Sequence, residues 1–162
     1  MADFDAAVTK TLINEGGARI TDDPNDRGGL TKYGISQRSY PNEDIRNLTE
    51  QRAKEIYKRD YWDKVNGDNI QSQQVAENIF DTAVNMGPKT ANRLAQMALE
   101  IEPVDGISGP QTVGALNAKD PESFIAEYTI AKIARYAAIC NRNRTQTKYL
   151  LGWVNRALGG IA

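Results

Sequence analysis

The sequence of 162 residues contains no histidine and only one cysteine, Cys140. Without histidine, no imidazole can activate a serine or cysteine nucleophile, and the commonest nitrogen ligand for metals is missing. One cysteine forms neither a disulfide within this sequence nor a thiolate metal site, and its apolar surroundings predict a small core residue. Acid–base chemistry at neutral pH therefore falls mainly to aspartate and glutamate, and we expect no metal and no cofactor.

The sequence also has almost no net charge and no long apolar run. The formal net charge is −1, so the chain has no overall basic field that would attract nucleic acid. No run approaches the roughly 18 apolar residues that a bilayer-spanning helix needs, and the first residues do not resemble a signal peptide. The lysine and arginine residues are nonetheless unevenly distributed along the sequence. Residues 132–156 carry lysine and arginine but no acid, which indicates either a solvated helix face or a contact surface for an anionic polymer.

The spacing of apolar residues predicts a mainly α fold in one domain. Apolar residues repeat every four positions from Phe4 to Leu12, which indicates a helix over 3–15. The segment 18–36 is rich in turn residues and is expected to hold a small β-hairpin. From Thr49, a candidate helix N-cap, the pattern is helical to the end. The expected helices there cover about 49–61, 75–86, 91–98, 110–116, 121–137 and 147–158.

Glu15 is the last residue of the first expected helix and precedes Gly16-Gly17, which should end it. At about 100° per residue, Glu15 points in nearly the same direction as Phe4, which places it at the end of the buried stripe. Burial penalises a charged carboxyl, so this glutamate would stay protonated near neutral pH and could act as an acid. The alternative is a helix-end glutamate that is solvated or held in a salt bridge.

The polar loop after this helix holds a second acid, Asp26, and a hydroxyl, Thr31. Asp26 lies among polar residues and glycines, where it should stay ionised, whereas Asp22 and Asp23 are acids of the kind common in turns. Hydrolysis of a glycosidic bond needs one protonated carboxyl and one that is ionised. Thr31 could hold a water through its hydroxyl, or it could be an ordinary β residue.

Three motifs in the first half carry a resemblance to a known family: Glu15-Gly16-Gly17, Asp26-Arg27-Gly28-Gly29-x-Thr31-x-Tyr33-Gly34-Ile35-Ser36 and Tyr57-x-x-x-Tyr61-Trp62. Three more lie in the second half: Phe80-Asp81-Thr82-Ala83-Val84-Asn85-Met86-Gly87-Pro88, Asp105-Gly106-Ile107-Ser108-Gly109-Pro110-Gln111-Thr112 and Gly152-Trp153-Val154-Asn155-Arg156. Together they resemble glycoside hydrolase family 108, the "Glu-Gly-Gly" N-acetylmuramidases of phages and Gram-negative bacteria, with their C-terminal peptidoglycan-binding region. The resemblance covers about Phe4 to Ala157.

This resemblance implies a lysozyme-like fold and cleavage of the β-1,4 bond from N-acetylmuramic acid to N-acetylglucosamine. It implies one compact domain, 1–162, with a catalytic lobe over 1–70 and a helical peptidoglycan-binding lobe over 71–162. Glu15 matches the catalytic glutamate and would be the general acid.

A looser similarity links the loop to the Glu-Asp-Thr phage lysozymes. It implies that Asp26 and Thr31 position the attacking water. The spacing departs from that type: Asp26 to Thr31 is one residue shorter and Glu15 to Asp26 two residues longer. Direct attack by water would invert the product and place the two carboxyl groups roughly 6.5–9.5 Å apart.

Aromatic and polar side chains near the motifs are candidates for binding the glycan. Aromatic rings bury a large area while keeping a polar edge, and Tyr57 and Tyr61 could equally pack in the core. Two polar candidates, Asp81 and Asn85, stand one turn apart on an expected helix, and each would form hydrogen bonds either to sugar amides or to the protein backbone. The full set of substrate-binding candidates is Tyr33, Tyr57, Tyr61, Trp62, Asp81 and Asn85.

Two alternatives to the hydrolase remain open at this point. A lytic transglycosylase would use the 6-hydroxyl of the sugar in place of water, and a non-catalytic module would only hold peptidoglycan. For the hydrolase we expect a phage or prophage endolysin that acts as a monomer on the glycan strand. We expect it to be made in the host cytoplasm without a signal peptide, and to reach the periplasmic cell wall after release by a holin.

Overall fold

Helix α1 (Phe4–Asn14) opens the computed structural model, which describes residues 1–25 and 27–159. The helix begins where the Asp3 carboxylate accepts a hydrogen bond from the backbone N–H of Asp5 at 2.8 Å. It ends at Glu15, whose N–H still donates to a carbonyl of the last turn. Gly16 and Gly17 then take φ values of 94° and 58°, the left-handed conformation that commonly terminates a helix.

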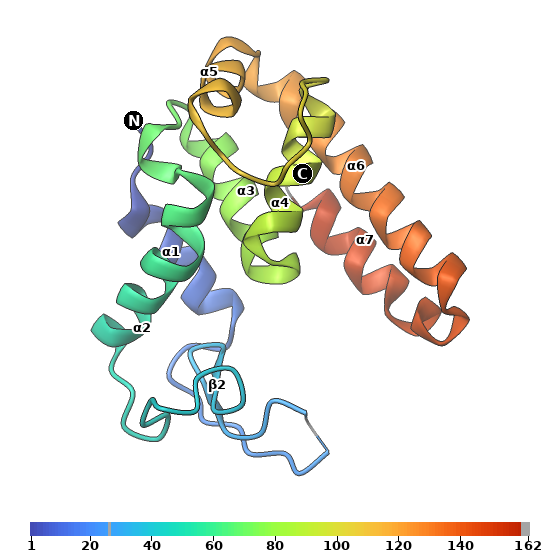
Figure 1. Ribbon diagram of the computed structural model, residues 1–162. Helices are drawn as coiled ribbons and strands as arrows, with labels where there is room; N and C mark the ends of the chain where they lie inside the picture. The colour runs from blue at the N-terminus through green and yellow to red at the C-terminus, as the bar shows by residue number, and fades with distance from the viewer. Residues whose placement is uncertain (26, 160–162) are drawn as a thin grey trace.

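A small antiparallel hairpin follows, as the turn-rich sequence predicts. Strands β1 (Thr31–Lys32) and β2 (Ile35–Ser36) pair with Thr31 opposite Ser36. Thr21 adds a single bridge to Thr31 through two backbone hydrogen bonds of 2.8 and 2.9 Å. Figure 1 shows this hairpin at one end of the molecule, apart from most of the helices.

Helix α2 (Glu50–Tyr57) begins at the expected cap. The Thr49 hydroxyl accepts from the N–H of Arg52 at 3.1 Å, which confirms the prediction of an N-cap. The expected helix to residue 61 does not continue as an α-helix. It passes into a π-helical turn, η1 (Lys58–Trp62), followed by the short 3₁₀ turns η2 (Asp63–Val65) and η3 (Gly67–Asn69).

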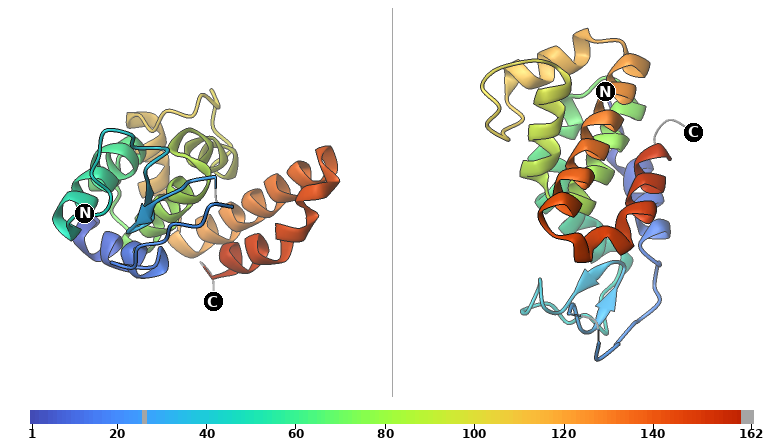
Figure 2. Two further views of the ribbon diagram at one scale, coloured as in Figure 1. Left: turned by 90° about the horizontal axis from the view of Figure 1, so that it is seen from below. Right: turned by 90° about the vertical axis from the view of Figure 1, so that its right-hand side faces the viewer.

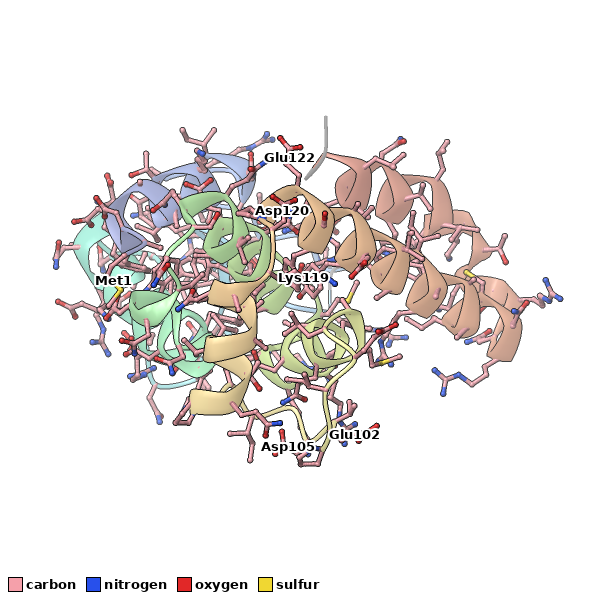
Figure 3. The ribbon with its side chains drawn as sticks, turned by 90° about the horizontal axis from the view of Figure 1, so that it is seen from above. Met1, Glu102, Asp105, Lys119, Asp120 and Glu122 are labelled. Carbon is pink, nitrogen blue, oxygen red and sulfur yellow. The ribbon has the colours of Figure 1, made fainter. Side chains whose placement is uncertain are left out.

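The second half contains five α-helices within the described residues. Proline occupies the first turn of three of them, where its missing N–H costs nothing. Gly87, at φ 90°, separates the first two, and Asp120 caps the longest by accepting from the N–H of Ser123 at 2.9 Å. Figure 3 shows Asp120 at the start of that helix, with Lys119 and Glu122 on either side in sequence. The helices are α3 (Gln73–Met86), α4 (Pro88–Ala98), α5 (Pro110–Ala118), α6 (Pro121–Arg142) and α7 (Leu150–Leu158), with a 3₁₀ segment η4 (Arg144–Tyr149) before the last.

One hydrophobic core joins helices α1 to α6, with α3 packed against α1, α4 and α6. Trp62 is completely buried in it, with its ring centroid 5.5 Å from those of Phe4 and Phe80. The indole N–H donates to a carboxylate oxygen of Asp68 at 2.7 Å, so burial leaves no unpaired donor. The core extends across position 70, and the division into lobes 1–70 and 71–162 stays a prediction.

The long helix α6 carries α7 alongside it, and both lie to one side of the remaining helices (Figures 1 and 2). Cys140, near the end of α6, is buried, which confirms the prediction of a small core residue. The turn η4 reverses the chain, so that α7 runs back toward α1 (Figure 2). The mainly α fold with one small hairpin is confirmed. None of the described helices is long and apolar enough to cross a bilayer.

Candidate active site

Glu15 is positioned by the way in which α1 ends. Its backbone N–H donates to the carbonyl of Thr11 at 2.9 Å, so the residue is still held by the last helical turn. The N–H of Gly17 donates to the carbonyl of Leu12 at 2.8 Å, which closes the glycine turn directly after it. The side chain of Glu15 therefore projects from a fixed helix end, and a quarter of its surface is exposed.

The tip of the hairpin rests against Glu15. The N–H of Tyr33 donates to the carbonyl of Gly17 at 3.0 Å, which ties the hairpin to the glycine turn. Gly34 has a φ of 76°, and a Cβ at this position would lie 2.7 Å from the Cβ of Glu15 and 2.5 Å from the hydroxyl of Tyr57. A side chain cannot fit in that space. The Gly34 of the family motif thus allows the backbone to approach the candidate acid closely.

Tyr57 fixes this approach from the other side. Its hydroxyl donates to the carbonyl of Tyr33 at 2.7 Å, and its ring is almost completely buried. Burial raises the pKa of the Tyr57 hydroxyl, and the negative charge of Glu15 nearby raises it further, so the group stays a hydrogen-bond donor. Tyr57 therefore positions the hairpin tip relative to Glu15.

Arg156 brings the last helix to the same place. Its Nη2 lies 3.3 Å from the Oε1 of Glu15 and 3.0 Å from the Oδ1 of Asp81, and its Nε lies 3.4 Å from the Oδ2 of Asp81. One guanidinium thus connects the end of α1, the middle of α3 and α7. The cation-rich stretch 132–156 was the sequence signal for this contact, but nothing in the sequence indicated its partners.

The expectation that apolar surroundings would enclose Glu15 is wrong. The carboxyl lies one residue beyond the helix, is partly open to solvent and meets a guanidinium, which is the salt-bridged alternative. The buried stripe of α1 consists of residues before it: Ala7, Val8, Thr11 and Leu12.

Of the two residues expected to position water, Thr31 and Asp26, only Thr31 lies within the described residues. Thr31 lies in β1, half-buried, and its hydroxyl donates to the carbonyl of Gly29 at 3.1 Å. Asp26 lies outside the described residues, and its role stays a prediction. Asp22 forms an exposed ion pair with Arg46, with 3.3 Å between Oδ2 and Nη2, as befits an acid in a surface turn.

The four aromatic candidates divide by exposure. Trp62 and Tyr57 are buried in the core and offer no surface to a sugar. Tyr33 and Tyr61 are half-buried, and the Tyr61 ring lies 5.7 Å from that of Tyr57. Direct contact with glycan therefore stays a prediction for Tyr33 and Tyr61.

The two polar candidates of α3 bond to side chains of other helices. Asp81 pairs with Arg156, and the amide of Asn85 donates to the hydroxyl of Tyr136 at 3.0 Å. Both remain accessible, so the sugar contacts predicted for them are still possible. Across 1–25 and 27–159, no three His, Cys, Asp or Glu side chains gather where they could hold a metal ion.

Comparison with known proteins agrees with the residues assembled at the end of α1. A model of the glycosyl hydrolase 108 family matches residues 8–87, which contain Glu15, the hairpin and Tyr57. This part of the chain belongs to the family. A second model, described as a "predicted peptidoglycan domain", matches residues 89–158. The two matches meet between α3 and α4.

A solved structure shows the same overall fold. SagA of Brucella abortus matches with a TM-score of 0.72 and 26% sequence identity, over 96% of this chain and 94% of SagA. No curated protein matches the chain. Together the two family matches support a glycoside hydrolase acting on peptidoglycan. Arg156, which contacts Glu15, lies in the second of the matched regions, so both regions contribute to the same site.

Proposed function

We propose that the protein is an N-acetylmuramidase that hydrolyses the β-1,4 bond between N-acetylmuramic acid and N-acetylglucosamine. The observation that carries this proposal is the position of Glu15 at a fixed helix end, enclosed by the hairpin tip and Arg156. Membership of the glycosyl hydrolase 108 family supports the reaction class, and the second matched region supports peptidoglycan as the substrate.

In the proposed reaction, Glu15 donates its proton to the glycosidic oxygen as the bond to the anomeric carbon breaks. A water held by Asp26 and Thr31 attacks the opposite face of that carbon and loses its proton to the ionised aspartate. The product then carries a new hydroxyl with inverted configuration. In this proposal, the 3.3 Å contact between Arg156 and Glu15 breaks when glycan enters and Glu15 takes up its role as the acid.

The test is digestion of purified Gram-negative peptidoglycan in water enriched in ¹⁸O, followed by mass spectrometry. A hydrolase places one ¹⁸O at each new reducing end. A lytic transglycosylase gives 1,6-anhydro ends without label, and a binding module releases no fragments. Either of the last two results would overturn the proposal.

The role of Glu15 is tested by Glu15→Gln, which keeps the shape of the side chain and removes the transferable proton. We expect a loss of activity of at least about two orders of magnitude, as for removal of one acid–base group. Glu122→Gln is the matched control because this exposed glutamate lies in the first turn of α6 (Figure 3) and is not among the residues that contact Glu15. Parental activity in Glu15→Gln would exclude Glu15 as the acid.

We also propose the biological setting expected for such an enzyme, a phage or prophage endolysin acting as a monomer on the periplasmic cell wall after release by a holin. Expression with and without a co-expressed holin, monitored by culture turbidity, tests this role. Lysis without a holin would contradict the proposed route.

A further inference from the structure

A cavity of about 530 Å³ opens between α1, α3, α6 and α7. Arg156 and Asp81 line it, and Arg156 also contacts the carboxyl of Glu15. Arg156 therefore borders both the cavity and the candidate acid. Its volume is within the range of sites that bind small molecules or parts of larger ones.

Lys132 of α6 lies on the wall of this cavity with only 4% of its surface exposed. Its ammonium donates to the Oδ1 of Asn78 at 2.9 Å and lies 5.1 Å from the centre of the Tyr128 ring. An ammonium has three N–H donors, and burial of a charge without a counterion is costly. Across the described part of the chain, no carboxylate is within ion-pair distance of Lys132. Of the two interpretations of the stretch 132–156, the solvated helix face does not hold at Lys132, because this residue is buried.

The other charges around the cavity already have partners. Lys10 pairs with Glu77 at 2.6 Å, and Arg156 pairs with Asp81 at 3.0 Å. Burial lowers the pKa of Lys132 to about 8, while the charge of Asp81 raises it and that of Arg156 lowers it. Lys132 thus keeps its proton at neutral pH, while none of these carboxylates lies within ion-pair distance of its ammonium.

We propose that this cavity binds a carboxylate of the peptide stem of peptidoglycan, with Lys132 as its counterion. The inference rests on the proposed function, because the stem is attached to the lactyl group of the muramic acid whose glycosidic bond would be cleaved. A carboxylate would accept hydrogen bonds from the remaining N–H donors of Lys132 and place a negative charge in direct contact with its ammonium. Thr11, Asn14 and Asn78 line the same cavity with groups able to bond to peptide amides.

Binding is measured by calorimetry at neutral pH with a free stem tripeptide that has its carboxylates intact. We expect Lys132→Met to bind it at least about tenfold more weakly than the parent, because a charged hydrogen-bond partner is lost. The matched control is Lys148→Met, which removes the same charge from an exposed position outside the cavity. Unchanged affinity in Lys132→Met would overturn the proposal.

A second measurement keeps the test valid if Lys132→Met fails to fold. The parent protein is titrated with the same tripeptide after its carboxylates have been converted to amides, and the affinity should fall by about tenfold or more. Equal affinity for the amidated peptide would refute carboxylate binding. Inorganic phosphate serves as a third probe, and binding of phosphate as tight as that of the tripeptide would assign the cavity to a free oxyanion instead of the stem.

These titrations involve no turnover, so the two proposals can fail separately. A parent that binds the tripeptide but releases no glycan fragments contradicts the muramidase and retains the carboxylate site. A parent that hydrolyses peptidoglycan but does not distinguish the tripeptide from its amidated form contradicts the carboxylate site alone.

Discussion

Glu15 and Arg156 are 141 positions apart in the sequence, and their side chains meet with 3.3 Å between Oε1 and Nη2. The contact joins the end of the first helix to the last helix. It also places the region matched by the peptidoglycan-domain model in direct contact with the candidate acid of the hydrolase region. The two matched regions therefore share one site.

Arg156→Met should lower the free energy of unfolding modestly. The guanidinium is partly exposed, and each of its ion pairs is expected to contribute roughly 0.5–1 kcal/mol. Urea denaturation at low and high salt measures the effect, which should shrink as salt screens the charges. Arg142→Met, at the exposed end of α6, is the control and should change stability little. A loss in Arg156→Met that is independent of salt would point to packing instead of charge.

Gly34→Ala should lower activity by about a hundredfold, since displacement of the hairpin tip by about 1 Å is enough for such a loss. The added Cβ would collide with Glu15 and with the hydroxyl of Tyr57, and the positive φ adds backbone strain. Gly87→Ala separates these two effects. It has a similar φ of 90° but open space around its Cβ, so it should lose stability without a comparable loss of activity. Equal activity losses in both variants would contradict a steric role for Gly34.

Tyr57→Phe should cost about 1 kcal/mol of stability, because the variant loses one hydrogen bond and leaves the carbonyl of Tyr33 without that donor. Activity should fall as well, since the bond holds the hairpin tip against Glu15. Thermal unfolding and release of glycan fragments are the two measurements. Tyr149→Phe, a half-exposed tyrosine with no hydroxyl bond to the hairpin, provides the comparison. Parental activity in Tyr57→Phe would show that the bond has no role in positioning.

Lys132→Met should stabilise the folded protein at neutral pH, because the parent buries an ammonium there. The pKa of Lys132 is about 8 in the folded protein and near its usual 10.5 in the unfolded chain. Below pH 8 both states bind the proton, and the full cost of burying the charge, roughly 3 kcal/mol, is present. Between pH 8 and 10.5 the unfolded state binds more protons, so the parent gains stability as the pH rises.

The difference between parent and Lys132→Met should therefore narrow as the pH rises from 8 to 10.5. Asp81 of α3, Arg156 of α7 and the Lys10–Glu77 pair between α1 and α3 are the charged groups around the cavity, and all remain in the variant. Urea denaturation at pH 7 and pH 10 provides the comparison. A difference that does not depend on pH would show that the ammonium is not penalised by burial.

The sequence predicted most helix boundaries because the signals that set them are local. Thr49 and Asp120 cap helices through their own side chains, and Gly87-Pro88 ends one helix and begins the next. The π-helical turn at Lys58–Trp62 was missed, because its pattern of apolar residues is shared with an ordinary helix.

The sequence alone limited the groups available for acid–base chemistry at neutral pH mainly to carboxylates, since it contains no histidine, and it placed Glu15 at the end of a helix. Tertiary structure decided the surroundings of that glutamate. Only packing could place Arg156 beside Glu15, bury Tyr57 and leave Lys132 at a cavity without a counterion among the described residues. The physical reason is range: caps and glycine turns act within a few residues, whereas the charges and contacts of the site join helices from opposite ends of the chain.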